Sequence, residues 1–204
     1  MSELSLIERD REALASPGQE KRARYVPWLR EPLSQLDFTI DGGLLSETLR
    51  TLEVPRPEVF GLDPFDMLSV VDLAWPAEAA SSLRQLAGVE PRLLDWPLAP
   101  GRLPLYVCQM CADIGCGAIT VEVTRGVGVI AWQAFQMENG YTNQSEMIDL
   151  SGLGPFTFDA NEYQAALLEP TGVLDALDAD ERAARAAWKA RRGVRGLVNR
   201  LRRG

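Results

Sequence analysis

The segment Leu105–Gln133, LYVCQMCADIGCGAITVEVTRGVGVIAWQ, decides the fold of this chain. It holds three runs of β-branched and aromatic residues, at positions 105–108, 118–123 and 127–133, separated by turns that contain glycine. Runs of this composition favour β-strands. Arg125-Gly126 stands between the second and third runs, where it marks the tip of a hairpin. The pattern predicts an antiparallel β-meander.

Helices are predicted after the meander. Asp159 is followed three residues later by Glu162, the spacing of a capping box, and this predicts a helix that continues to Leu168. Asp178 and Glu181 repeat the spacing and predict the start of a final helix. The apolar seam of that helix advances by alternating steps of four and three residues: Ala183, Ala187, Ala190, Val194, Leu197 and Leu201. Such a seam packs on a protein body or on a partner helix, and we expect the body because monomers seldom expose a contiguous apolar stripe.

The first half of the chain mixes short elements with proline-rich loops. Periodicity predicts helices at 4–15, 44–52 and 77–86, strands at 36–40 and 65–75, and loops at 53–64 and 91–104. We therefore expect an α+β fold in which an antiparallel meander packs with several helices as a single domain. Residues 1–175 form the globular part and residues 176–204 an amphipathic basic helix.

Charge is segregated along the chain. Residues 1–180 hold 12 Lys and Arg against 28 Asp and Glu, whereas residues 181–204 hold 9 against 1. An acidic body repels nucleic acid and attracts basic protein surfaces, although the same charge also serves solubility. The basic end could contact RNA, an anionic membrane or the acidic body. Asp63, Asp66 and Asp72 match no metal-binding loop and are expected at the surface.

Several chemistries are excluded by what the sequence lacks. The 204 residues include no histidine, which removes Ser-His-Asp and Cys-His catalysis and histidine general bases. We find no phosphate-binding or dinucleotide-binding glycine motif, and no apolar run long enough to span a membrane. The N-terminal residues are acidic rather than a basic, apolar secretory signal, and the three cysteines form no secreted disulfide framework, so we expect a cytoplasmic protein.

One compact motif could carry chemistry. Cys108, Cys111 and Cys116 form a C-x2-C-x4-C array beside Asp113. Three thiolates could bind zinc, with Asp113, water or a partner group as the fourth ligand, and a C-x2-C pair could also be redox-active. The favoured interpretation is packing, because small cysteine side chains suit a tight turn beside a core. We therefore expect no cofactor and keep zinc as the alternative.

The motif resembles that of an uncharacterised bacterial family common in actinobacteria, with a pattern close to YVCxxCxDxGCGxxT. The matching residues run from Tyr106 to Thr120, continue with Val129, Trp132 and Phe135, and extend to PFTFDANEYQAAL at Pro155–Leu167. Members of that family are sometimes labelled oxidoreductases. The resemblance covers about residues 105–168 and implies no particular mechanism.

These observations favour a non-catalytic, protein-binding inhibitor over an enzyme. The most concrete expectation is an immunity protein whose acidic surface neutralises a cognate bacterial toxin, with a basic toxin domain as its partner and no nucleic acid bound. The alternative is a thiol- or zinc-dependent enzyme or regulator that uses Cys108, Cys111 and Cys116. The sequence leaves the oligomeric state open.

Overall fold

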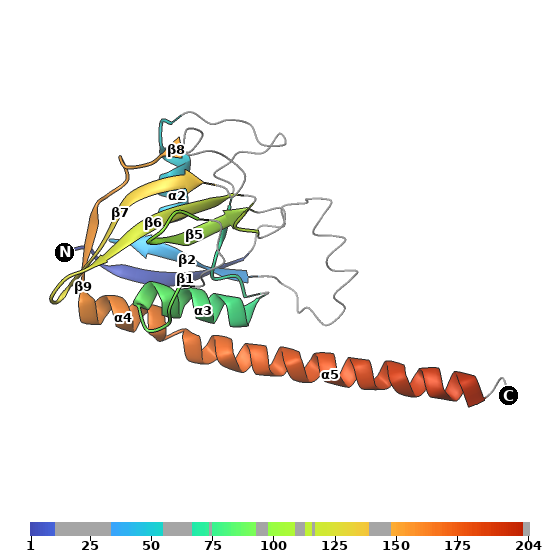
Figure 1. Ribbon diagram of the computed structural model, residues 1–204. Coiled ribbons are helices and arrows are strands. Elements are labelled where there is room, and N and C mark those ends of the chain that lie inside the picture. The colour runs from blue at the N-terminus through green and yellow to red at the C-terminus, as the bar shows by residue number, and fades with distance from the viewer. Residues whose placement is uncertain are drawn as a thin grey trace.

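The computed structural model describes residues 1–10, 34–54, 67–73, 75–92, 98–108, 113–115, 117–138 and 148–201, with residues 10, 68, 188 and 190–201 described as backbone. It shows an α+β fold built from two antiparallel sheets and several helices, with a long C-terminal helix (Figure 1). The predicted fold class is confirmed. None of the helices in these ranges is long and apolar enough to cross a membrane.

The larger sheet contains the predicted meander. Its strands run in the order β4 (Met67–Ser69), β5 (Arg102–Cys108), β6 (Ala118–Arg125), β7 (Val129–Glu138) and β8 (Ile148–Asp149), and β9 (Phe156–Asp159) also pairs with β7. All these pairings are antiparallel. The β6–β7 hairpin turns at Gly126, where the sequence predicted it. Of the predicted strand at 65–75, the described residues 67–73 and 75 form a strand only at β4.

The smaller sheet corrects one prediction. Residues Leu4–Asp10 form strand β1 rather than a helix, and β1 pairs with β2 (Ser34–Ile40), which in turn pairs with the two-residue β3 (Gly43–Leu44). Leu4 lies opposite Ile40 and Leu6 lies opposite Phe38, so the apolar residues of β1 share one face. A partner strand thus overrides the charge pattern that favoured a helix.

Backbone hydrogen bonds join the two sheets. Leu36 N–H donates to Val71 O at 2.9 Å and Leu73 N–H donates to Ser34 O at 3.0 Å, so β2 runs beside the segment that follows β4. At the other end, Ser2 N–H donates to Thr157 O of β9 at 2.6 Å. The sheets therefore enclose one common core.

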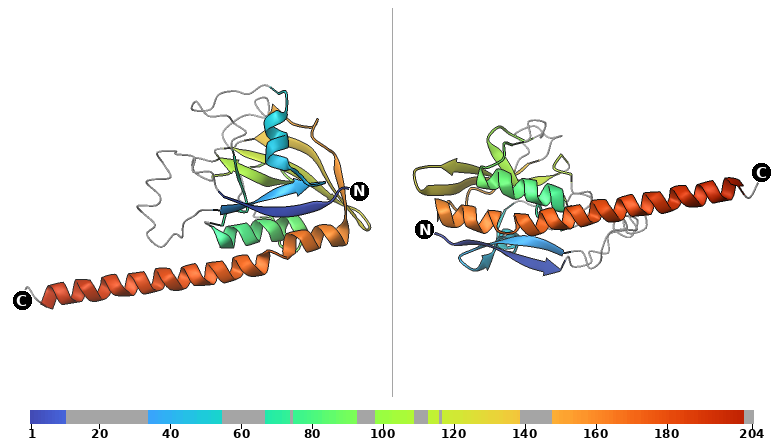
Figure 2. Two further views of the ribbon diagram at one scale, coloured as in Figure 1. Left: turned by 180° about the vertical axis from the view of Figure 1, so that it is seen from behind. Right: turned by 90° about the horizontal axis from the view of Figure 1, so that it is seen from below.

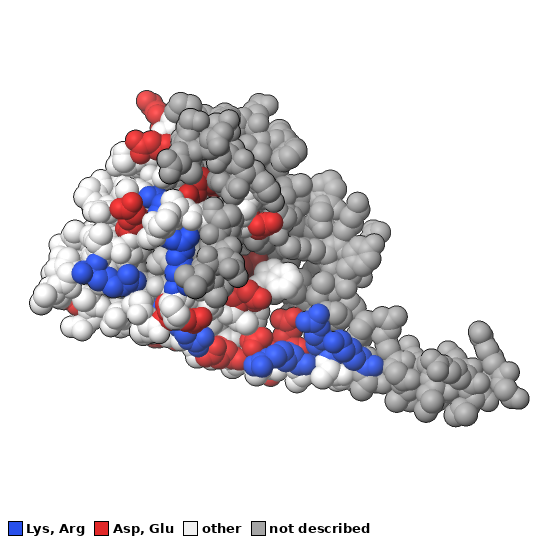
Figure 3. Space-filling view, viewed as in Figure 1, with Lys and Arg blue, Asp and Glu red and all other residues white. Residues whose placement is uncertain are grey.

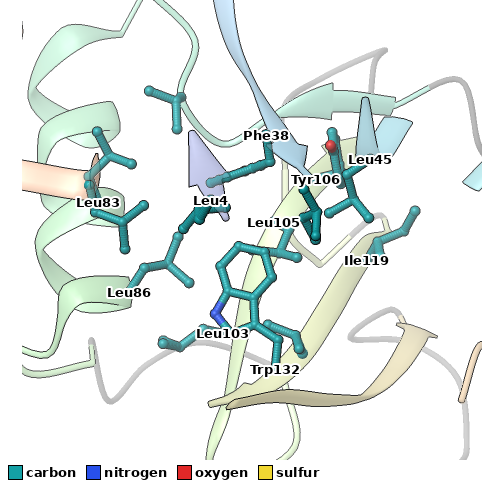
Figure 4. Close-up of a cluster of buried hydrophobic side chains, with 14 of the residues drawn as sticks. Leu4, Phe38, Leu45, Leu83, Leu86, Leu103, Leu105, Tyr106, Ile119 and Trp132 are labelled. Atoms are coloured by element: carbon teal, nitrogen blue, oxygen red, sulfur yellow. The ribbon is translucent and has the colours of Figure 1, made fainter. Parts of the chain in front are cut away.

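Three short helices match their predicted positions: α2 (Leu45–Thr51), α3 (Pro76–Ala87) and α4 (Ala160–Leu168). Asp159 caps α4 as predicted, since its carboxylate accepts from Asn161 N–H at 2.9 Å and Glu162 N–H at 3.1 Å. From α3, Leu83 and Leu86 point into the core toward Leu4 and Trp132 (Figure 4).

Trp132 on β7 lies at the centre of the core. Its ring meets Phe38, Phe158 and Tyr163 edge-on, with centroids 5.4–6.0 Å apart. Its indole N–H donates to Tyr163 Oη at 2.9 Å, and Tyr163 donates to Leu86 O at 3.0 Å. Edge-to-face geometry and satisfied polar atoms let large aromatic rings be buried without loss of hydrogen bonds.

The last helix, α5 (Thr171–Leu201), begins seven residues before the predicted cap at Asp178. Asp178 instead forms an ion pair with Arg182 within the helix, at 2.8 Å. Early in the helix Leu174 is buried, and Asp175 pairs with Arg84 of α3. Figures 1 and 2 show the rest of α5 projecting beyond the body.

The expectation that the α5 seam packs on the body is wrong for its described side chains. Ala183 and Ala187 are both exposed. Leu174 lies nine residues before Ala183, and at about 100° per residue this places the two positions on opposite faces of the helix. The body therefore binds the other face.

Candidate functional site

The cysteine motif is described only in part. Cys108 ends β5, is half-buried, and has its backbone N–H bonded to Gly117 O at 2.9 Å, which brings the two ends of the loop together. Cys111 and Cys116 lie outside the described residues, so the predicted array is not tested. No group of three or more potential metal ligands occurs among the residues that are described.

Asp113 stabilises a turn in this loop through a side-chain hydrogen bond. Its side chain is exposed, and Oδ1 accepts a 2.8 Å hydrogen bond from Gly115 N–H. This Asx-type bond stabilises the turn, as expected for Asp two residues before a glycine. One carboxylate oxygen is thus engaged by the backbone.

Asp72 departs from its predicted place at the surface. Its side chain is buried, because the backbone of Asp72 forms a bridge with Gln35 at the junction of the two sheets. Asp63 and Asp66 lie outside the described residues. Sequence spacing gave no sign of this burial, which results from a contact between residues 37 positions apart.

The structure places a polar cluster around Asp37 that was not anticipated. Asp37 lies on β2 and is fully buried. Its Oδ1 accepts from the Tyr106 hydroxyl at 2.6 Å and from Phe38 N–H at 2.9 Å. Its Oδ2 accepts from the Ser46 hydroxyl at 2.5 Å and from Arg9 at 3.3 Å. The cluster joins β1, β2, α2 and β5.

Hydrogen bonding shows what the Asp37 cluster can do. An ionised carboxylate offers about four acceptor positions, and all four are used here. Burial, followed by the neighbouring Asp37 charge and hydrogen bond, raises the pKa of Tyr106 well above its ordinary value. A phenol held protonated is a poor base, and a saturated carboxylate has no position for a substrate proton. The cluster therefore acts as a buried anchor between four elements.

A second buried cluster forms at Arg102 on β5. The guanidinium donates to Thr120 Oγ1 at 2.8 Å and to Glu138 Oε1 at 3.2 Å, and it also bonds the backbone oxygens of Thr120 and Ala134. Glu138 Oε2 accepts from Ala99 N–H at 3.2 Å. Because both charges are buried and paired, this cluster also serves the fold.

A sequence signal for both clusters did exist. Asp37 interrupts the apolar run LDFTI, and Arg102 begins the buried strand RLPLYVC. A charge inside an apolar strand is rarely buried without a partner. The signal identifies such residues as unusual, but the partners come from other strands and cannot be read from spacing.

The surface of the described body is rich in acidic side chains. Exposed acidic residues occur on nearly every element: Glu3, Glu8, Asp41, Glu47, Glu53, Glu78, Asp113, Asp149, Glu162, Glu169, Asp175 and Asp180. In the described part of residues 1–180, the exposed basic residues are Arg50 and Arg125. On the face seen in Figure 3, acidic and basic side chains are both spread over the body, and further acidic and basic ones lie along α5.

The exposed acidic residues near the N-terminus lie on neighbouring elements. Glu3 and Glu8 flank or lie in β1, Asp41 is in the β2–β3 turn, and Glu47 is in α2. The left panel of Figure 2 shows β1, β2 and α2 on the same side of the body. Glu3 N–H bonds Asp41 at 2.7 Å, and Glu47 lies 3.7 Å from Arg9. We call these four exposed acidic residues of neighbouring elements the N-terminal acidic face.

Comparison with known proteins adds no relative. No protein-family model matches this chain, and neither does any curated protein or solved structure. The resemblance to the actinobacterial family remains a hypothesis, and function is argued from the geometry alone.

Proposed function

We propose that this chain is a non-catalytic inhibitor that binds a basic protein through its acidic surface. The observation that carries the proposal is the charge of the described body, whose exposed acidic residues far outnumber its two exposed basic residues, Arg50 and Arg125. A surface of one sign attracts a partner of the opposite sign and speeds correct encounter. The buried carboxylates Asp37 and Glu138 take no part, because their oxygens are already bonded within the fold.

The more specific form of the proposal is an immunity protein of the bacterial cytoplasm. Its partner would be a basic toxin domain, and the acidic surface would cover the cationic site with which such a toxin binds its substrate. The N-terminal acidic face is our choice of contact surface, because it combines four exposed carboxylates on adjacent elements with only two arginines, the half-buried Arg9 and the exposed Arg50 of α2.

A pull-down from the native host at low salt tests this function. We expect the full chain to capture a basic protein, and the purified partner to lose its toxicity or enzymatic activity when one equivalent of this chain is added. A captured protein whose activity is unaffected would contradict the inhibitor proposal. Metal analysis of the same preparation tests the alternative, a thiol- or zinc-dependent protein.

Charge reversal tests the chosen surface. The double variant Glu3→Lys, Glu47→Lys changes two exposed side chains of the N-terminal acidic face and should weaken capture at low salt. The matched control is Glu162→Lys, Glu169→Lys, which makes the same charge change on two exposed positions, one in α4 and one at its C-cap. Equal weakening by both variants would show that net charge acts and that this face has no special role.

A further inference from the structure

The face of α5 opposite Leu174 is exposed wherever its side chains are described. Small residues occupy it in the first part of the helix, and each is exposed: Gly172, Ala176, Ala179, Ala183 and Ala187. The backbone helix carries the same face onward to positions occupied by Ala190, Val194, Leu197 and Leu201. We call this the α5 seam. The right panel of Figure 2, seen from below, shows no other described element in front of α5.

The charges of α5 are divided along its length. Positions 171–181 hold four acidic residues and no basic one, whereas positions 182–201 hold seven basic residues and no acidic one. Two such helices side by side in parallel would place like charges together. In the antiparallel arrangement the acidic part of one helix lies beside the basic part of the other, and opposite charges are complementary.

From this charge division we propose that the α5 seam binds the same seam of a second copy of this chain in an antiparallel pair. The occupant is a second copy because one helix carries both complementary halves. A symmetric pair of this kind closes after two copies, since each contributes the same surface. The proposal is independent of the inhibitor function, which uses the acidic surface of the body.

The sizes of the seam residues agree with this orientation. When the pair is centred between positions 186 and 187, Gly172 of one copy lies opposite Leu201 of the second. Ala176 then lies opposite Leu197, and Ala179 lies opposite Val194. Small residues thus meet large ones at both ends, an alternation that lets facing layers interdigitate. A parallel pair would place small residues on small ones at one end.

The same register brings opposite charges to one flank of the seam. Asp180 and Arg191 are eleven residues apart, so at about 100° per residue they lie on nearly the same side of the helix. With the stated centre, Arg191 of the second copy lies about two residues, or roughly 3 Å, along the axis from Asp180. The symmetry of the pair repeats this contact, and because Asp180 is exposed, the contact should be sensitive to salt.

The mass of the intact chain in solution is the first test, measured by light scattering at high micromolar concentration and low salt. We expect a dimer. Ala183→Arg places a large charged side chain in the middle of the seam and should give a monomer with an unchanged helical signal, since Ala183 is exposed in the single chain. Ala184→Arg makes the same change one position away, off the seam, and should remain dimeric. A monomeric parent chain, or a dimer that persists in Ala183→Arg, would overturn the proposal.

Orientation is tested by oxidative cross-linking of two single variants, Ala176→Cys and Leu197→Cys. In the antiparallel pair these positions face each other, so a mixture of the variants should form far more linked dimer than either variant alone. The parent chain, which has its own three cysteines, sets the background. Strong linking within each variant alone and none in the mixture would establish a parallel pair and refute the orientation.

Discussion

The Tyr106 hydroxyl on β5 donates a 2.6 Å hydrogen bond to the fully buried carboxylate of Asp37 on β2. The two residues are 69 positions apart in the chain and belong to different sheets. The bond thus ties the small N-terminal sheet to the meander, beside the backbone bonds between β2 and residues 71–73. A charge buried in this way depends on each of its donors.

Tyr106→Phe should lower the free energy of unfolding by about 1–3 kcal/mol, because it removes one donor and leaves a buried carboxylate oxygen under-bonded. Urea unfolding should show a lower midpoint with an unchanged slope. The matched control is Tyr163→Phe, which also removes a buried hydroxyl but one that bonds a neutral carbonyl and an indole. A smaller loss in Tyr106→Phe than in the control would contradict a special role for the charged acceptor.

Stability should fall as the pH rises above about 10. Burial, as the largest cause, raises the pKa of both Tyr106 and Tyr163 above the ordinary value of 10.0. Below that value these phenols are protonated in both states, so they add no pH dependence. Above it they ionise in the unfolded chain only, which favours unfolding by about 1.4 kcal/mol per pH unit for each group. Replacing either tyrosine with phenylalanine should reduce the alkaline slope, and an unchanged slope would refute this assignment.

Arg125 and Gly88 should show strong energetic coupling. Arg125, at the end of β6, donates to the carbonyls of Gln85 and Leu86 at the C-terminus of α3. Gly88 ends that helix with φ 79°, and a Cβ there would lie 2.6 Å from Arg125 Nε. Gly88→Ala should cost about 1–2 kcal/mol or more through left-handed strain and this contact. In Arg125→Ala the same glycine substitution should cost less, and strict additivity of the two changes would exclude the contact.

Cys111→Ser should leave the metal content of the purified protein at zero if the cysteines serve packing. The substitution should then lower stability by only about 1–3 kcal/mol through a buried polar group. Metal analysis of the parent chain and the variant provides the check. One equivalent of zinc in the parent that disappears in Cys111→Ser would establish the metal site.

The local parts of this fold could be predicted because their causes are local. Asp159 caps α4 through backbone groups two and three residues away, and the same short range explains the Gly126 turn and the Asp113 turn. The strands of the meander follow from runs of β-branched residues that favour a pleated, half-buried surface. The separation of acidic residues from the basic C-terminal segment can also be read directly from the sequence, because it depends only on the order of residues.

The remaining features depend on contacts between distant residues, so only the tertiary structure decided them. Residues Leu4–Asp10 become a strand because β2 supplies a partner edge, and Asp72 is buried because it meets Gln35 there. Asp37 can be buried as a charge because Ser46, Arg9 and Tyr106 converge on it from three other elements. The seam of α5 can be recognised in the sequence as a repeat of apolar residues at steps of four and three positions. Such a repeat does not show which face of the helix packs on the body. The burial of Leu174 shows which face packs on the body, and the described side chains of the seam, up to Ala187, are exposed on the other face.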